Sequence, residues 1–244
     1  MSIEWPELLR HGRVGVRPIR RRDAGAWREV RARNVAWLRP WEATMPPGNP
    51  SVASSFRAMV RDARRQARDG RGLVLVTLYD GQLVGQVTLT GLTRGSAQWV
   101  QVGYWIDRDL AGRGITTTAV ALVVDHCLQD LDLHRVEIAI RPENTASLRV
   151  VDKLGFRREG LAPRYLHIDG AWRDHLLCAL TVEELPTGGL TGRLARPIAV
   201  PSVSPPPPTS PPPAAPTSPP ASPAPAATTS GERDPSRHPT AGAG

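Results

Sequence analysis

The sequence predicts a mixed α/β (α+β) fold, in which helices flank a central and mostly antiparallel sheet. Two observations support this prediction. Strand-like segments flank the dipeptides Asp80-Gly81 and Asp169-Gly170, and Asp-Gly between two strands favours a tight antiparallel hairpin. Between the hairpins, residues 99–140 alternate strand, helix and strand, and such a crossover makes its two strands parallel. We therefore expect one parallel pair inside an otherwise antiparallel sheet.

The N-terminal half provides three strands and two helices. A short strand is predicted at 14–19, and Asp, a preferred N-cap residue, begins a helix over 23–32. Apolar residues recur every three or four positions over 52–68, which predicts a second helix. The aliphatic run at 73–79 and the alternating run at 83–89 are typical of paired strands.

The C-terminal half provides the crossover and the second hairpin. Residues 99–106 are apolar on both faces, which indicates a central strand. The apolar spacing over 114–131 predicts a helix, and the alternation at 136–140 predicts a strand. A further helix over 144–154 ends at Gly155, a residue favoured just after a helix. The second hairpin has its strands at 165–168 and 171–182.

Composition changes abruptly at Pro186. Residues 186–244 hold 17 of the 25 prolines and no aromatic residue, so they cannot bury enough apolar surface to offset the entropy of ordering. We expect residues 1–185 to form one folded domain and residues 186–244 to form a disordered tail rich in Pro, Ala, Ser and Thr. The tail is either a solvated extension or a docking strip for a proline-binding partner.

The charge and the cysteine content exclude several classes of protein. The 244 residues carry a net charge of +8, but Lys153 is the only lysine, which indicates a compositional bias toward arginine. We expect no direct nucleic-acid role, and the arginines within 57–71 are interpreted as a solvated helix face. No apolar run approaches the ~20 residues of a membrane span, and Cys127 and Cys178 are too few for a disulfide framework. The expected compartment is the cytoplasm, without membrane contact or metal site.

The strand at 99–106 leads through a short loop into the helix at 114–131, and the loop contains Gly112 and Gly114. Glycine lets the backbone adopt a positive φ and approach a ligand closely. A helix N-terminus presents unpaired N–H groups and a partial positive charge, which suit a pyrophosphate. The alternative is a tight turn whose glycines serve packing only. The P-loop and dinucleotide-binding motifs are excluded, because Gly-Lys-Ser/Thr and a third glycine at the required spacing are missing.

A second motif lies further along the chain, where Asn144-Thr-Ala-Ser147 is followed by Lys153-Leu-Gly-Phe156. Together with Gly112-Arg-Gly-Ile-Thr116, this motif resembles the GCN5-related N-acetyltransferase (GNAT) superfamily, whose acetyl-CoA pyrophosphate loop corresponds to the glycine segment. Other segments resemble its ribosomal-protein-alanine (RimJ/RimL-type) branch over residues 10–185. They are Trp37-Leu-Arg-Pro-Trp41, Gly103-Tyr-Trp105, His134-Arg-Val-Glu137 and Trp172-Arg-Asp-His175.

The resemblance implies that acetyl-CoA is the cosubstrate and that no metal is required. It implies a splayed parallel strand pair, in which the backbone of Tyr104, Trp105 and Ile106 pairs with the pantetheine arm. The alternative for the two aromatic side chains is core packing. The chain departs from the family loop at Ala111, where Gln or Arg is usual, and at Thr116, where Gly or Ala is usual. The residues expected to hold the pyrophosphate are Gly112, Arg113, Gly114, Ile115, Thr116 and Thr117.

Candidate catalytic residues also follow from the resemblance. Ser147 resembles the hydroxyl proposed to protonate the leaving thiolate, and Asn144 is expected to hydrogen-bond the bound cofactor. Asn144 is equally a preferred N-cap, in which case Ser147 is an exposed residue of the first turn. Family members with a glutamate base on the strand would carry it nearest Ala139, so Glu137, on the same strand face, is the candidate base. The alternative for Glu137 is a structural ion pair with an arginine.

The expected reaction moves an acetyl group from acetyl-CoA to an amine, and the family suggests the N-terminal α-amine of a ribosomal protein. Trp37 and Trp41 are candidate walls of the acceptor cleft, or else a lid without a role in specificity. His134 and His175 are interpreted as structural, and the chain is a candidate homodimer. The alternatives are a small-molecule amine as acceptor, which predicts an enclosed acidic pocket, and a non-catalytic acyl-CoA-binding or scaffold protein.

Overall fold

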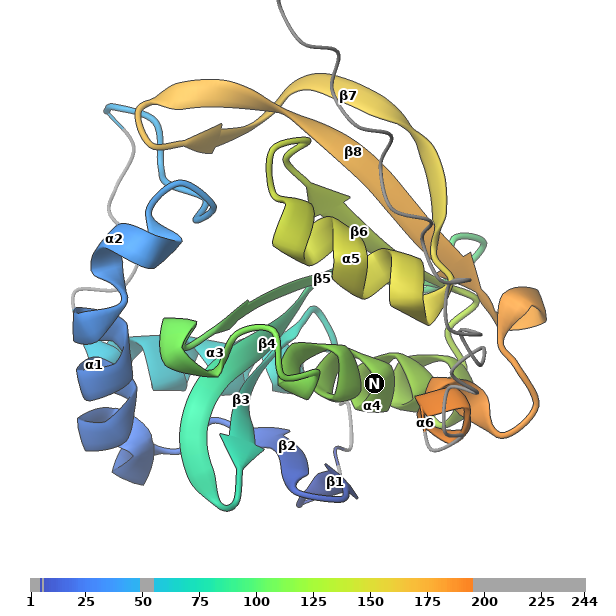
Figure 1. The fold of residues 1–244 in the computed structure, drawn as a ribbon, viewed down its shortest axis with the longest axis horizontal. Helices are drawn as coiled ribbons and strands as arrows, with labels where there is room; N and C mark the ends of the chain where they lie inside the picture. Colours follow the sequence, from blue (N-terminus) through green and yellow to red (C-terminus); the bar gives the residue numbers. More distant parts are fainter. Residues whose placement is uncertain (1–4, 6, 49–54, 195–244) are drawn as a thin grey trace, which may run out of the picture. The chain divides into compact units, whose positions relative to one another are not determined.

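The computed structural model describes residue 5, residues 7–48 and residues 55–194 of the chain. Within these residues, eight strands form one sheet in the order β1-β2-β3-β4-β5-β6-β8-β7 (Figure 1). All neighbouring strands are antiparallel except β5 and β6, which confirms the predicted fold class. The strands are β1 (Leu9–His11), β2 (Val14–Pro18), β3 (Leu73–Tyr79), β4 (Gln82–Thr93), β5 (Trp99–Ile106), β6 (Arg135–Ile140), β7 (Arg157–Ile168) and β8 (Ala171–Thr181).

The parallel pair separates after a short paired stretch. The two strands are in register from Trp99 opposite Arg135 to Gln101 opposite Glu137. Beyond this point β5 pairs only with β4, while β6 continues to pair with β8. Figure 1 shows β5 and β6 diverging. On its β6 side, the backbone of residues 102–106 therefore has no strand partner in the described part of the chain.

Helices cover both faces of the sheet. One face carries α4 and α5, whose apolar side chains form the larger core with those of β2 to β6 and β8. On the other face, α1 and α3 bury Val30, Val60 and Ala63 against β3 and β4. The helices are α1 (Ala24–Arg33), α2 (Val35–Leu38), α3 (Phe56–Arg68), α4 (Ile115–Gln129), α5 (Thr145–Leu154) and α6 (Gly189–Leu194), with short 3-10 turns at Arg21–Asp23, Arg108–Leu110 and Val182–Glu184.

The last described helix, α6, lies beyond residue 185, where the sequence places the end of the folded domain. The carboxylate of Asp125 in α4 accepts hydrogen bonds from the backbone N–H of Leu190 (2.7 Å) and of Thr191 (3.0 Å). Leu190 is fully buried in the larger core. These contacts hold α6 against the middle of α4. The part of the predicted tail from residue 195 onward lies outside the described residues.

Two other elements differ from the sequence prediction. The sequence predicts a strand only from residue 165, whereas β7 begins at Arg157. Most side chains of residues 157–164 are exposed and two register shifts interrupt the pairing with β8, so the alternation that marks a half-buried strand is missing. The short strand β1 was also not predicted. No helix in the described part of the chain is long and apolar enough to cross a membrane.

Candidate active site

The loop between β5 and α4 presents a row of unpaired backbone amides. Gly114 is the N-cap of α4 with a φ of 78°, and Gly112 has the same φ. The first helical hydrogen bond is donated by Thr118 to the Gly114 carbonyl (2.9 Å), and none of the amides of residues 112–117 has an acceptor within the described chain. A Cβ at either glycine would meet no atom within 4 Å. Free N–H groups, the helix dipole and open space together suit a pyrophosphate.

A buried polar cluster fixes the start of this loop. The carboxylate of Asp107 accepts hydrogen bonds from Arg33 Nε (3.0 Å) and Asn34 Nδ2 (2.9 Å), and Asn34 Oδ1 accepts from the backbone N–H of Arg108 (2.9 Å). Burial favours a higher pKa for Asp107, but these hydrogen bonds outweigh it and the pKa lies below its ordinary value. Through Asn34, the cluster connects the junction of α1 and α2 to the loop that follows β5. The sequence did not reveal it, because Asn34 and Asp107 are far apart in the chain and form no local motif.

Beyond the point where the strands part, the side chains of β5 point alternately to the two faces of the sheet. Tyr104 packs under α5, where its hydroxyl donates to the Ser147 carbonyl (3.4 Å), and burial raises the pKa of Tyr104. Ile106 packs against the same core. Trp105 lies on the opposite face, with the guanidinium of Arg31 over its ring (5.3 Å). Both aromatic side chains therefore pack, and on the β6 side the backbone of residues 104–106 has no strand partner among the described residues.

The start of α5 lies next to this strand segment. Asn144 caps the helix, since its Oδ1 accepts from the backbone N–H of Ser147 (3.0 Å). Ser147 is half-buried and contacts Tyr104 through its carbonyl. The capping interpretation of Asn144 is thus observed, and its Nδ2 has no partner among the described residues. The structure brings Tyr104, Asn144 and Ser147 together between β5 and α5.

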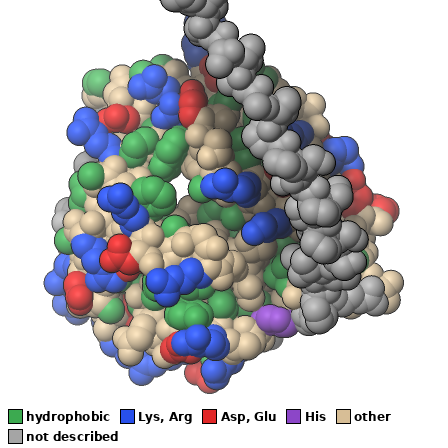
Figure 2. Space-filling model, viewed as in Figure 1, with side chains coloured by type: hydrophobic (Ala, Val, Ile, Leu, Met, Phe, Trp, Pro, Cys, Tyr) green, Lys and Arg blue, Asp and Glu red, His purple; other side chains and the backbone are tan. Residues whose placement is uncertain are grey.

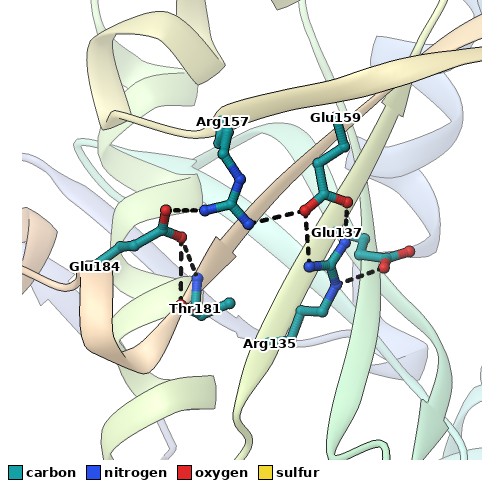
Figure 3. A network of polar contacts seen from close by, with 6 residues as sticks. All are labelled: Arg135, Glu137, Arg157, Glu159, Thr181 and Glu184. Carbon is teal, nitrogen blue, oxygen red and sulfur yellow. Dashed lines mark hydrogen bonds and ion pairs between the residues drawn. The ribbon is translucent and has the colours of Figure 1, made fainter.

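Glu137 belongs to an ion-pair network on β6 and β7 (Figure 3). Arg135 Nε donates to Glu137 Oε1 (2.6 Å), and the same guanidinium binds both oxygens of Glu159. Arg157 bridges Glu159 and Glu184. The hydrogen bonds from Arg135 and Arg157 hold the pKa of Glu159 at about 2. The ion pair that the sequence offered as the alternative role of Glu137 is therefore present.

The two tryptophans suggested for the acceptor cleft are each covered by an arginine. The guanidinium of Arg108 lies 5.9 Å from the ring centre of Trp37, and that of Arg141 lies 5.4 Å from the ring centre of Trp41. Arg141 also donates to the Pro40 carbonyl (2.7 Å), which fastens the segment after α2 to the end of β6. Neither tryptophan lines the neighbouring groove directly.

An open groove of about 440 Å³ lies between α1, α2 and the turn that joins β7 to β8. Two ion pairs cross its wall: Arg31 with Glu42 (2.6 Å) and Arg39 with Asp169 (2.7 Å). Figure 2 shows the surface hollowed between α2 and α5, with both apolar and basic side chains around the hollow. The groove is lined by Arg31, Val35, Arg39, Glu42, Thr44, Met45, Pro47, His167, Asp169 and Gly170.

Comparison with known proteins decides the family. The profile of the acetyltransferase (GNAT) domain matches residues 13–157, more than half of the chain. The chain belongs to the GNAT acetyltransferases. The solved structure of Mycobacterium smegmatis RimJ in complex with CoA-disulfide is 44% identical in sequence and superposes with a TM-score of 0.69, covering 74% of this chain and 87% of that one.

Curated relatives of this GNAT enzyme support the same family assignment. The putative ribosomal N-acetyltransferase YdaF of Bacillus subtilis is 31% identical over 70% of this chain and 92% of its own length. The [ribosomal protein uS5]-alanine N-acetyltransferase of Escherichia coli is 29% identical over 72% and 91%. The probable N-acetyltransferase YjcK of B. subtilis is 42% identical, but the match spans only 59% of that protein. The chain is an acetyl-CoA-dependent N-acetyltransferase of the RimJ type.

Proposed function

We propose that this GNAT enzyme acetylates the N-terminal α-amine of a protein, with a ribosomal protein as the first candidate. The names of YdaF and of the E. coli relative support this class of acceptor. A cytoplasmic reaction would follow from such an acceptor. An α-amine has an ordinary pKa of about 7.7–8.0, so a substantial neutral fraction is available for attack without a strong base.

The proposal rests on the observation that the carboxylates in the groove are ion-paired. Glu42 and Asp169 are its acidic residues, and both are paired with arginines that also line it. A small polycationic amine would need unpaired carboxylates in an enclosed pocket, because burying its charge is otherwise costly. The observed groove is open, and its exposed apolar side chains Val35 and Met45 suit a polypeptide.

The cofactor side is proposed to act mainly through backbone groups. The amides of residues 112–117 would bind the pyrophosphate, and the backbone of residues 104–106 would pair with the pantetheine arm. One N–H group of this strand would polarise the thioester carbonyl. The Asn144 side chain would use its free Nδ2 toward the pantetheine, and Ser147 would supply a proton to the leaving thiolate.

On the acceptor side, Trp37 and Trp41 are proposed to hold residues 38–40 in place. Arg39 of this segment lines the groove, whereas the two tryptophans do not. Glu137 would serve as base only if its carboxylate can leave Arg135. We define the acceptor face as the face of β5 and β6 opposite α4 and α5. By strand alternation it carries Gln101, Gly103 and Trp105 of β5 with Glu137 and Ala139 of β6.

A panel of acceptors with labelled acetyl-CoA tests the proposal. The panel contains peptides that match ribosomal protein N-termini, the same peptides with a blocked α-amine, spermine and an aminoglycoside. We expect acetylation of free N-termini, none of the blocked peptides, and catalytic efficiency on the small amines lower by at least about 100-fold, which corresponds to about 2.7 kcal/mol. Preferred use of spermine or the aminoglycoside would contradict the proposal.

Two further expectations remain predictions. Because α6 (Gly189–Leu194) packs on α4, only the part of the tail after it is proposed to be dispensable. Deleting residues 195–244 should leave the kinetic constants unchanged within about twofold, since a group outside the site changes no transition-state contact. A homodimer is expected to appear in sedimentation velocity as a single species of twice the chain mass.

A further inference from the structure

Gly103 marks open space on the acceptor face. The residue is exposed, and a Cβ built on it would meet no atom within 4 Å. It lies two residues beyond Gln101, where β5 and β6 part, and two residues before Trp105. A ligand can therefore reach the β5 backbone from this side, next to the segment proposed to hold the thioester.

The hydroxyl of Tyr165 lies at the edge of this space. Gln101 Nε2 donates a hydrogen bond to it at 3.2 Å. Tyr165 belongs to β7, and two strands, β6 and β8, lie between β7 and β5 in the sheet. The Gln101–Tyr165 hydrogen bond therefore links β5 to β7 across the acceptor face, on which β6 contributes the small residue Ala139. The Tyr165 hydroxyl thus brings a polar group from another strand to the face on which β6 carries the apolar residue Ala139.

The surroundings of Tyr165 fix its direction. The register of β7 shifts within residues 162–166, and such a bulge re-aims the side chains near it. Arg164 has a φ of 51°, and its backbone N–H donates to Asp174 (2.8 Å). The Tyr165 ring packs against the His175 ring, with centroids 5.7 Å apart. His175 is 2% exposed, and burial lowers its pKa.

We propose that Tyr165 contacts the acceptor amine and orients it for attack, with Gln101 holding the hydroxyl in place. This inference rests on the proposed function. The phenol oxygen accepts one hydrogen bond from Gln101 and keeps a second lone pair, which accepts an N–H of the neutral amine above Gly103. The lone pair of the amine then points toward the thioester carbon, in the geometry of a near-attack conformer.

The transfer step balances with these groups. The amine nitrogen forms a bond to the acetyl carbon, and the carbon–sulfur bond breaks with its electron pair on sulfur. The amine releases its extra proton to solvent water, and Ser147 protonates the thiolate and recovers a proton from water, so the products are an N-acetyl amide and the free CoA thiol. The amine arrives on the acceptor face beside Tyr165, whereas Ser147 stands with Tyr104 on the α5 face.

Tyr165→Phe tests the inference, because phenylalanine keeps the ring against His175 and removes only the hydroxyl. We expect the kcat/KM for the best acceptor of the panel to fall about tenfold, the usual effect of losing one positioned hydrogen bond. The Kd for acetyl-CoA and the urea unfolding midpoint should not change. Tyr79→Phe is the matched control, since Tyr79 lies on β3 and its hydroxyl makes no hydrogen bond within the described residues; it should retain full activity.

A double-mutant cycle separates positioning from packing. Gln101→Leu should lower kcat/KM less than Tyr165→Phe, and the double variant should equal Tyr165→Phe alone, because Gln101 acts through the hydroxyl. Wild-type kcat/KM in Tyr165→Phe, or additive losses in the double variant, would overturn the inference. If a small amine is the best acceptor, the proposed function is wrong, but the Tyr165 variants are still tested with that amine. If no amine of the panel is acetylated, both the proposed function and the role of Tyr165 are wrong.

Discussion

The two faces of the parted strands are built from different parts of the chain. On the cofactor side, a continuous run from β5 through the loop to α4 offers backbone amides, and the glycines in it leave the space above them open. On the acceptor side, side chains from several segments converge, and Arg31, Arg39, Gln101 and Arg141 each bind a partner from another segment of the chain. The cofactor side is therefore one contiguous stretch of sequence, whereas the acceptor side is assembled from segments that are distant in the chain.

This difference follows from the chemistry of the two ligands. A pyrophosphate carries the same charge in every turnover, so unpaired N–H groups at a helix N-terminus suffice to bind it. An acceptor amine must be recognised in its own sequence context, which requires side chains of particular shape and charge. We therefore expect substitutions on the cofactor side to abolish binding outright and those on the acceptor side to change rates by smaller factors.

The largest effect is expected from Gly112→Val. The φ of 78° strains any β-branched residue, and the new Cβ would enter the space where phosphate must approach. We expect the affinity for acetyl-CoA to fall beyond about 1000-fold, more than about 4 kcal/mol, in calorimetry. Gly95→Val is the matched control, because Gly95 has a φ of 74° and equally open surroundings. It should lose similar stability but keep its affinity; an unchanged affinity in Gly112→Val would refute the amide row as the pyrophosphate site.

Ser147→Ala is expected to have an intermediate effect. The serine lies beside Tyr104 on the α5 face, and only its hydroxyl is removed, since its contacts to Asn144 and Tyr104 are made by its backbone N–H and carbonyl. Turnover should fall about 100-fold, the low end for loss of a general acid, because a thiolate is a good leaving group. The Kd for acetyl-CoA should stay constant. Steady-state kinetics with the best peptide measures this, and an unchanged kcat would remove the serine from the mechanism.

The sequence predicted the sheet, its parallel pair and the glycine-containing turn into α4, because each depends on local patterns such as Asp-Gly turns, apolar spacing and the glycines before α4. It did not predict Asn34 with Asp107, or Gln101 with Tyr165. The two residues of each pair are far apart in the chain, and the register of β7 shifts around Tyr165. Nothing in the sequence around Tyr165 distinguishes it from a residue of an ordinary edge strand.

The smallest effect is expected from Glu137→Gln. Glutamine keeps an oxygen that can accept from Arg135 Nε, so the partly exposed network of Figure 3 should lose less than about 1 kcal/mol of stability. If the ion pair is the whole role of Glu137, kcat should change less than about threefold, whereas loss of a catalytic base typically costs about 100-fold or more.

The pH dependence of Glu137→Gln sharpens this comparison of an ion pair with a base. The pKa of Glu159 is lowered to about 2, so its contribution to stability is complete above its ordinary value of 4.5 and is lost only as the pH falls toward 2. Between about pH 6 and pH 9, where an α-amine titrates, the network is therefore intact and cannot shape the rate profile. We expect the wild type, Glu137→Gln and the matched variant Glu159→Gln to show the same rising profile, set by the amine itself. A profile altered in Glu137→Gln alone would make the carboxylate of β6 the base, and the acceptor side would then contain one residue as decisive as the glycines of the loop.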